Sequence, residues 1–225
     1  PKIIDTILTI LLIGLIIVTC MYVLYEIRKN KILDRVMKYS LESFESNIKN
    51  YTDPSGESYN LRDFYIMSSY NSCCNSDFRN GYVTLDALKG VISKGARVLD
   101  LEIYNMNNQP VVACSTSDSY DFKDCYNSLQ LEKVIKTIRD NAFSASTCPN
   151  FEDPLILHLR VKTKNFKVCN KIASIIAKKL TNIKGLGGKY NYGYGSREGV
   201  ESLMEEPMTN FLRKVIIMTD KSNEY

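Results

Sequence analysis

"VTLDALKGVISKGARVLDLEIYN", residues 83–105, decides the fold class of this chain. Its first part, "VTLDALKGVISKG", has the apolar spacing of a helix and ends at Gly95, a residue type that often closes helices. The part that follows, "RVLDLEIYN" (97–105), has the pattern of a strand. A helix that leads directly into an aliphatic strand is typical of α/β proteins, so the stretch predicts an α/β fold.

The flanking segments continue this alternation of strands and helices. Further strands are predicted over residues 63–71 ("DFYIMSSYN"), 109–115, 154–163 and 211–220, and further helices over residues 129–143 and 166–183. Such alternation predicts a parallel sheet or an α/β barrel. Functional residues of a parallel barrel gather at the C-terminal ends of its strands. Here those ends hold Ser68 to Asn71, Asp100 to Glu102, Cys114 and Arg160.

The N-terminal segment "TILTILLIGLIIVTCMYVLY" (6–25) has twenty residues without a charge, which is the length that crosses a bilayer core. A secretory signal would have a shorter apolar region and a small-residue cleavage site. We therefore expect a retained transmembrane anchor over residues 1–27 that contacts the lipid bilayer through residues 6–25. Pro1 is typical of a chain whose initiator methionine has been removed, so we expect a genuine N-terminus.

Basic residues follow the apolar segment: Arg28, Lys29 and Lys31. The positive-inside rule then predicts a single-pass membrane protein whose C-terminal domain lies on the cytosolic side. Leu33, Met37, Leu41, Phe44 and Ile48 recur at helical spacing and predict an amphipathic helical stalk over residues 28–50. Its stripe could pack on its own domain or on a partner helix. Pro54 and Gly56 mark a linker over residues 51–59, followed by a domain over residues 60–225.

Composition excludes several classes of protein. The net charge of +4 comes from interspersed acidic and basic residues, so we expect no nucleic-acid partner. One cysteine lies in the apolar segment and six lie in the body. An even six would suit disulfides, whereas a cytosolic domain predicts free thiols. There is no CxxC pair and no complete phosphate-loop motif in "GLGGKYNYGYGS" (185–196), so we expect neither zinc nor another cofactor.

The ordered motifs "DFYIMSSYNS", "ALKGVISKGARVLDLEIYN", "NQPVVACS", "VIKTIRDNAFSAS" and "PLILHLR" resemble the X region of phosphoinositide-specific phospholipases C. The resemblance covers residues 60–165 well and residues 200–221 weakly. It implies a TIM-barrel-like fold that cleaves phosphoinositides with two histidines and, in eukaryotes, a calcium ion. A complete barrel needs about 200 to 250 residues. The barrel is therefore abbreviated, completed by a partner, or continued by a segment beyond this sequence.

Several positions depart from the pattern of that family. Where the family has Ser-His-Asn, this chain has Ser69, Tyr70 and Asn71. The family's Glu-Leu-Asp is here Asp100, Leu101 and Glu102. Cys114 stands at the second histidine, and Arg160 stands at a glutamate that binds the metal. The substrate-binding lysines of the last strand would fall near Met218 and Asp220 and are absent.

These replacements imply a catalytically inactive domain. The reaction needs an acid and a base that titrate near neutrality, whereas tyrosine and cysteine ordinarily titrate near ~10 and ~8.5. We expect Arg160 to pair with both Asp100 and Glu102 and so to neutralise the former metal site without a metal. The former active-site positions are thus Tyr70, Asn71, Asp100, Glu102, Cys114 and Arg160.

Two further interpretations remain. A metal-independent phosphoinositide phosphodiesterase could use a Cys114–His158 pair, although strand alternation favours His158 as a buried, hydrogen-bonded core residue. An inactive domain would instead be a structural or binding module with a protein partner in the membrane or in a capsid shell. The frequent Lys, Asn, Ile and Tyr residues are typical of AT-rich genomes, and a virion protein in the internal membrane of a large DNA virus fits this composition.

Overall fold

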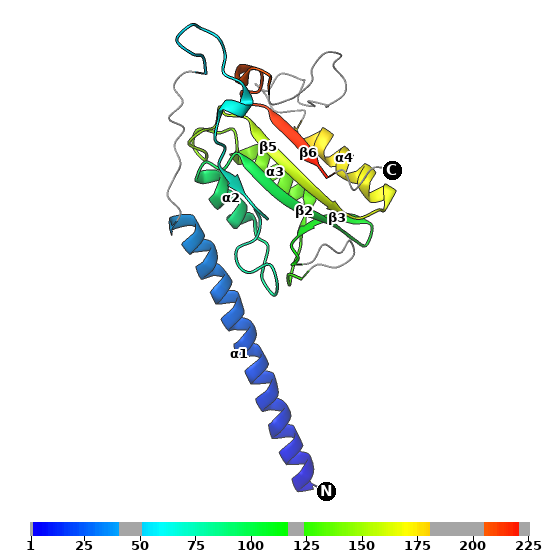
Figure 1. Ribbon diagram of the computed structural model, residues 1–225. Helices are drawn as coiled ribbons and strands as arrows, with labels where there is room; N and C mark the ends of the chain where they lie inside the picture. The colour runs from blue at the N-terminus through cyan, green and yellow to red at the C-terminus, as the bar shows by residue number, and fades with distance from the viewer. Residues whose placement is uncertain (1, 41–50, 117–123, 181–204, 221–225) are drawn as a thin grey trace.

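The computed structural model describes residues 2–40, 51–116, 124–180 and 205–220. A long helix, α1 (Lys2–Ser40), projects away from an α/β body (Figure 1). The body contains the strands β1 (Ser68–Ser69), β2 (Val98–Met106), β3 (Gln109–Ala113), β4 (Leu129–Gln130), β5 (Leu155–Lys162) and β6 (Val215–Thr219). Within the described residues its α-helices are α2 (Leu85–Ser93), α3 (Leu131–Asn141) and α4 (Phe166–Leu180), and the 3-10 turns are η1 (Leu61–Asp63) and η3 (Met208–Asn210).

The strands form one mixed sheet in the order β4-β3-β2-β5-β6, and β1 pairs with the start of β2. The pairs β1–β2, β2–β5 and β5–β6 are parallel, as expected. β2 and β3 form an antiparallel hairpin because Asn107 and Asn108 both have positive φ (51° and 60°), the backbone of a tight two-residue turn. β4 and β6 do not pair, so the described part of the sheet is open rather than a closed barrel.

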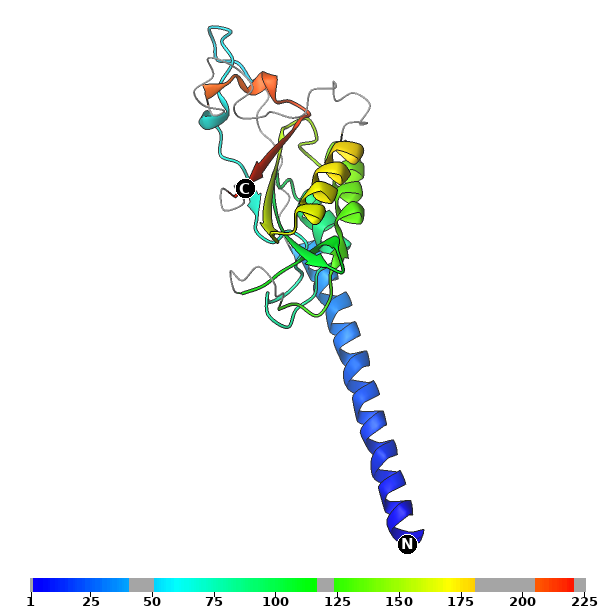
Figure 2. The ribbon, with the colours of Figure 1, turned by 90° about the vertical axis from the view of Figure 1, so that its right-hand side faces the viewer.

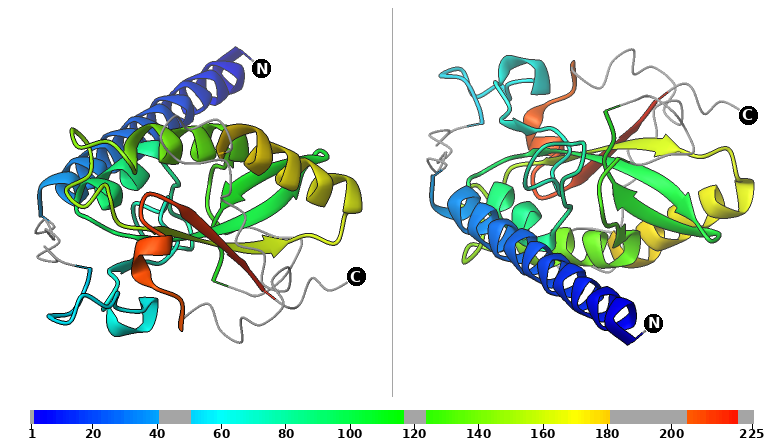
Figure 3. Two further views of the ribbon diagram at one scale, coloured as in Figure 1. Left: turned by 90° about the horizontal axis from the view of Figure 1, so that it is seen from above. Right: turned by 90° about the horizontal axis from the view of Figure 1, so that it is seen from below.

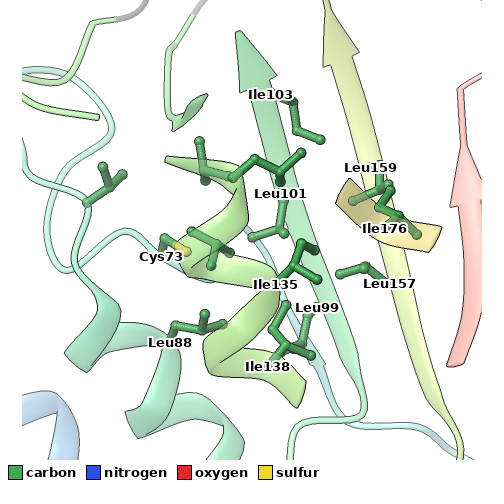
Figure 4. Packing of buried hydrophobic residues seen from close by; sticks show 14 of the residues in the cluster. Cys73, Leu88, Leu99, Leu101, Ile103, Ile135, Ile138, Leu157, Leu159 and Ile176 are labelled. Atoms are coloured by element: carbon green, nitrogen blue, oxygen red, sulfur yellow. The ribbon is translucent and has the colours of Figure 1, made fainter. Parts of the chain in front are cut away.

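One face of the sheet is covered by α2, α3 and α4 (Figures 2 and 3). Leu99 and Leu101 of β2 and Leu157 of β5 point toward these helices and are fully buried against side chains such as Ile135 (Figure 4). Because side chains alternate along a strand, Asp100, Glu102, His158 and Arg160 lie on the opposite face. The apolar core therefore fixes which face carries the polar residues.

A second, smaller core covers part of that opposite face. Leu61 of η1 and Met208 and Phe211 around η3 pack there against Ile156 and Ile216. This cluster lies near the N-terminal halves of β5 and β6, so the polar residues gather toward the C-terminal ends of the strands. The expected position of functional residues is thus retained although the sheet is open.

The helices α2 and α4 and the strands β2, β3 and β5 are confirmed. The helix expected over residues 129–143 begins only at Leu131, because Leu129–Gln130 form the strand β4, and the strand expected over residues 211–220 begins only at Val215. The first strand is wrong in length, since it pairs only over Ser68–Ser69 and not over residues 63–71. Asn71 has a left-handed backbone (φ 45°) that turns the chain away from β2 just beyond this pair. The last three residues of the helix expected over residues 166–183 lie outside the described residues.

The N-terminal helix continues from the apolar segment through Ser40, and residues 41–50 of the expected stalk lie outside the described residues. Residues 2–29 lie in one helix long and apolar enough to cross a membrane, by length and composition, and the 18-residue window that meets this criterion has mean hydropathy 2.8 and no buried residue. The segment expected to be a linker begins at Tyr51, whose hydroxyl donates to the Asp153 carboxylate at 2.7 Å. Thr52 and Ser58 form an isolated bridge around the turn in this segment.

Candidate functional site

The polar face of the sheet is organised by the register of β2 and β5. Asp100 lies opposite His158, and Glu102 lies opposite Arg160. The pairing of Ser69 with Leu99 brings the end of β1 to the same place. The backbone N–H of Asn71 there donates to the Asp100 carboxylate at 3.0 Å. The structure therefore brings together five of the expected site positions: Tyr70, Asn71, Asp100, Glu102 and Arg160.

Arg160 is the centre of this cluster. Its Nε and Nη2 donate to the two Asp100 oxygens at 3.0 and 2.6 Å, and its Nη1 donates to Glu102 Oε1 at 2.5 Å. The expected pairing of Arg160 with both carboxylates is confirmed. The side chains of Arg160, Asp100 and Glu102 are only 11%, 8% and 2% exposed, so both ion pairs are largely removed from water.

Further groups complete the shell around the guanidinium. Nη2 also donates to Asn71 Oδ1 at 2.8 Å, and the Tyr70 ring lies 4.5 Å from the guanidinium carbon. This stacking is a cation–π contact, and Tyr70 in turn packs edge-on against Phe78. Tyr70 thus covers one face of the Arg160 guanidinium.

The electrostatics of the cluster favour a permanently charged Arg160. Burial alone would lower the pKa of its guanidinium, but the hydrogen bonds and negative charge of Asp100 and Glu102 outweigh burial and raise this pKa above its ordinary value. Burial also raises the pKa of the Glu102 carboxyl, against the opposing effects of Arg160 and of the Ser115 N–H, which donates to Glu102 at 2.9 Å. The Tyr104 hydroxyl, which donates to Glu102 at 3.3 Å, and the charge of Lys162 lower this pKa as well, so four neighbours favour the ionised carboxylate against burial.

His158 is not the buried core histidine that strand alternation favoured. Its Nδ1 lies 2.8 Å from Asp100 Oδ2, its Nε2 lies 3.2 Å from Asp220 Oδ1, and its side chain is 29% exposed. The expectation fails because Asp220, just after β6, reaches the neighbouring strand and gives the second nitrogen a partner. Since both ring nitrogens face carboxylates, the geometry does not form the alternative Cys114–His158 pair.

Cys114 follows β3 and lies in a separate cluster of thiols. Its Sγ is 3.5 Å from Cys74 Sγ and 3.7 Å from the carbonyl oxygen of Phe78, and the residue is fully buried. Hydrogen bonding to Cys125 and Cys74, together with burial, raises the pKa of the Cys114 thiol far above its ordinary range. In this state Cys114 is a poor nucleophile, because thiolates and not thiols attack. The sequence did not identify these neighbouring thiols.

The calcium ion implied by the family resemblance does not fit these residues. Calcium takes six to eight oxygen ligands and so needs converging, unoccupied oxygens. Oxygens of Asp100, Glu102 and Asn71 instead accept hydrogen bonds from the Arg160 guanidinium. Within the described parts of the chain, no group of three or more His, Cys, Asp or Glu side chains could hold a metal ion.

Comparisons with known proteins agree with this fold. A family model described as "Phosphatidylinositol-specific phospholipase C, X domain" matches residues 57–183. Among solved structures, the chain is similar to PLC21 of L. pealei (18% identity, TM-score 0.53) and PLC21 of S. officinalis (19% identity, TM-score 0.54). Each alignment covers 75% of this chain but 19% of the other chain. At this identity the likeness shows the fold alone. No curated protein matches the chain.

Proposed function

Because the chain belongs to the family of phosphatidylinositol-specific phospholipase C X domains, we propose that it is a membrane-anchored, catalytically inactive member of that family. It acts as a structural or binding module. The observation that carries this proposal is the position of Arg160, whose guanidinium binds both Asp100 and Glu102. An organic cation at this place provides the charge that a metal would provide, but it offers no open coordination position to a substrate.

The remaining groups of the site also favour inactivity. General acid–base catalysis requires side chains that exchange protons near neutral pH. The Tyr70 ring lies on Arg160, and the Cys114 thiol is buried with a raised pKa. His158, the one histidine of the chain, is held between Asp100 and Asp220. The side chains that would have to exchange protons in a phosphodiester cleavage, Tyr70, Cys114 and His158, are therefore already engaged in contacts within the domain.

The proposed architecture is TIM-barrel-like and includes a membrane anchor. The parallel strands β1, β2, β5 and β6, with helices on their outer face, support a part of such a barrel. The apolar helix over residues 2–29 supports an anchor over residues 1–27, and the basic residues after it favour a cytosolic body. The binding partner would be another membrane protein or a capsid shell protein of a large DNA virus.

A phosphodiesterase assay on the purified full chain tests this proposal. The chain is incubated with phosphatidylinositol vesicles in calcium and in chelator, beside a catalytically active member of the family as a positive control. We expect no release of soluble inositol phosphate above the vesicle background in either condition. Turnover in chelator that is lost in Cys114→Ala would instead establish the metal-independent phosphodiesterase, and calcium-dependent turnover would refute the proposed inactivity.

A further inference from the structure

Three thiols from three separate segments meet beside the candidate site. Cys74 belongs to the turn after β1, Cys114 follows β3, and Cys125 precedes β4. The Sγ atoms of Cys74 and Cys114 are 3.5 Å apart, and the backbone N–H of Cys114 donates to Cys125 Sγ at 3.3 Å. We propose that Cys74 and Cys114 form an oxidisable pair, a site at which the domain takes up a reversible disulfide.

The close approach of the two sulfurs, 3.5 Å apart, favours Cys74 as the partner of Cys114, although the Cys74 thiol also donates to the Ser76 carbonyl oxygen at 3.1 Å. The Cys125 thiol donates to the Asn127 carbonyl oxygen at 3.1 Å, while its sulfur accepts from the Cys114 backbone. Cys125 therefore already has main-chain partners, in addition to its side-chain contact with Cys114. The thiol of Cys114 is directed at Cys74 Sγ, and the two sulfurs must approach by about 1.5 Å to reach the length of a disulfide bond.

Cys73, although adjacent to Cys74 in sequence, does not compete. Its side chain is buried in the hydrophobic core among residues such as Leu88 (Figure 4). Burial raises the pKa of the Cys73 thiol, so this thiol is also the less reactive of the two. Cys74 by contrast is half-buried, which leaves part of its surface accessible to a small oxidant.

The two members of the pair are suited to different steps of the oxidation. The hydrogen bond from Cys114 lowers the pKa of the Cys74 thiol, which favours Cys74 as the thiolate that attacks first. The oxidant of this pair would be a low-molecular-weight disulfide such as oxidised glutathione.

Thiolate attack by Cys74 breaks the glutathione disulfide, forms a mixed disulfide and releases one glutathione thiolate, which takes up the proton that Cys74 lost. The mixed disulfide removes the negative charge of Cys74, which is one of the causes of the raised Cys114 pKa. Cys114 then attacks Cys74 Sγ, and its proton passes to the departing glutathione sulfur, so the second glutathione leaves as a thiol. Two protein thiols are oxidised, and one glutathione disulfide is reduced to two thiols.

The disulfide would join the two segments that border the Arg160 cluster. The Cys74 N–H donates to the Asn71 carbonyl at 2.7 Å, and Ser115, next to Cys114, donates to Glu102. A cross-link here closes a loop of about 40 residues, which restricts the unfolded chain. The oxidised domain is therefore expected to melt at a higher temperature than the reduced one. This inference does not depend on catalytic inactivity, because its test involves neither lipid turnover nor a metal.

Peptide mapping of the full chain tests the pair directly. The protein, purified in detergent micelles and reduced, is equilibrated with oxidised glutathione, then alkylated, digested and analysed by mass spectrometry without reduction. We expect a Cys74–Cys114 cross-linked peptide, a loss of two alkylated thiols, and a raised melting temperature that a reductant reverses. Cys74→Ser should abolish all three effects, whereas Cys169→Ser, which changes a half-buried thiol on α4, should leave them intact.

Other outcomes would overturn the proposal. A dominant Cys114–Cys125 cross-link would show that the wrong partner was chosen. Glutathione that stays on Cys74 and is not displaced by Cys114 would show that the two sulfurs cannot meet. Thiols that stay reduced under conditions in which the urea-unfolded chain oxidises would show that the folded domain prevents the bond. Cys74→Ala provides a second variant if Cys74→Ser does not fold.

Discussion

Replacing Arg160 by methionine should destabilise the domain strongly, because it removes the cation and leaves its partners in place. Methionine keeps much of the length and apolar volume of the arginine stem, so the change tests charge and hydrogen bonding more than packing. Asp100 and Glu102, at 8% and 2% exposure, would then be two carboxylates without their common cation. Both would face each other across a site with little access to water.

The expected loss in the free energy of unfolding depends on the hydrogen-bond partners that each carboxylate retains. Removing one partner of a buried ion pair costs about 3–5 kcal/mol. Asp100 would keep the Asn71 N–H and His158, and Glu102 would keep the Ser115 N–H and the Tyr104 hydroxyl, so we expect the lower end, about 3 kcal/mol. For a chain of this size, that corresponds to a fall in melting temperature of roughly 6–12 °C.

Thermal and urea unfolding, followed by near-ultraviolet circular dichroism of the tyrosines, would measure the loss. Arg62→Met is the matched control because its pair with Glu205 is about half exposed, at 54% and 55%, so we expect a change below about 0.5 kcal/mol. The triple variant Arg160→Met, Asp100→Asn, Glu102→Gln should recover much of the lost stability, since it removes the unpaired charges. A loss below about 1 kcal/mol in Arg160→Met would refute the reasoning.

Three further predictions concern other parts of the chain. Because folding raises the pKa of Glu102, its contribution to stability is present below the pKa of the unfolded chain, about 4.3, and is lost as the pH rises through the pKa of the folded chain. The free energy of unfolding of the wild type, measured relative to that of Glu102→Gln, should therefore fall as the pH rises from about 4.3. A difference that rises with pH would contradict this. Arg97→Met should cost about 3 kcal/mol or more in urea unfolding, because buried Arg97 donates to three backbone carbonyls, and a near-neutral effect would be the contrary result. The chain has no tryptophan, so Leu15→Trp should report the anchor alone: lipids brominated on their chains should quench its fluorescence but not that of Tyr65→Trp, a fully exposed position on the body, and equal quenching would argue against the anchor.

Much of the fold could be predicted because its core follows simple periodicity. Leu99, Leu101 and Leu157 alternate with polar residues, and this pattern predicts both the strands and the face that packs on the helices. The first strand was overestimated because the apolar residues 64–67 suggest a strand, whereas Ser68 already lies opposite Val98, the first residue of β2, so the residues before it have no strand to pair with there. The 3-10 turns at Leu61 and Met208 carry no comparable pattern.

The site was predictable where it depended on the resemblance and on strand alternation. Those two sources place Asp100, Glu102 and Arg160 together, and the structure confirms their contacts. The environment of His158 was not predictable, because its second partner, Asp220, lies 62 residues away in sequence. The approach of Cys74 to Cys114 likewise depends on how two loops fold over the ends of β1 and β3. Tertiary contacts between loops leave no local signal in a single sequence.

Calcium titration tests most directly whether the Arg160 guanidinium occupies the place of a metal ion. Isothermal titration of the purified full chain with calcium should give no saturable binding, because the oxygens that would bind the ion accept hydrogen bonds from Arg160. Arg160→Glu, which adds a carboxylate and removes the cation, should bind calcium detectably and so serves as the positive control. Micromolar calcium binding by the unmodified chain would contradict the account.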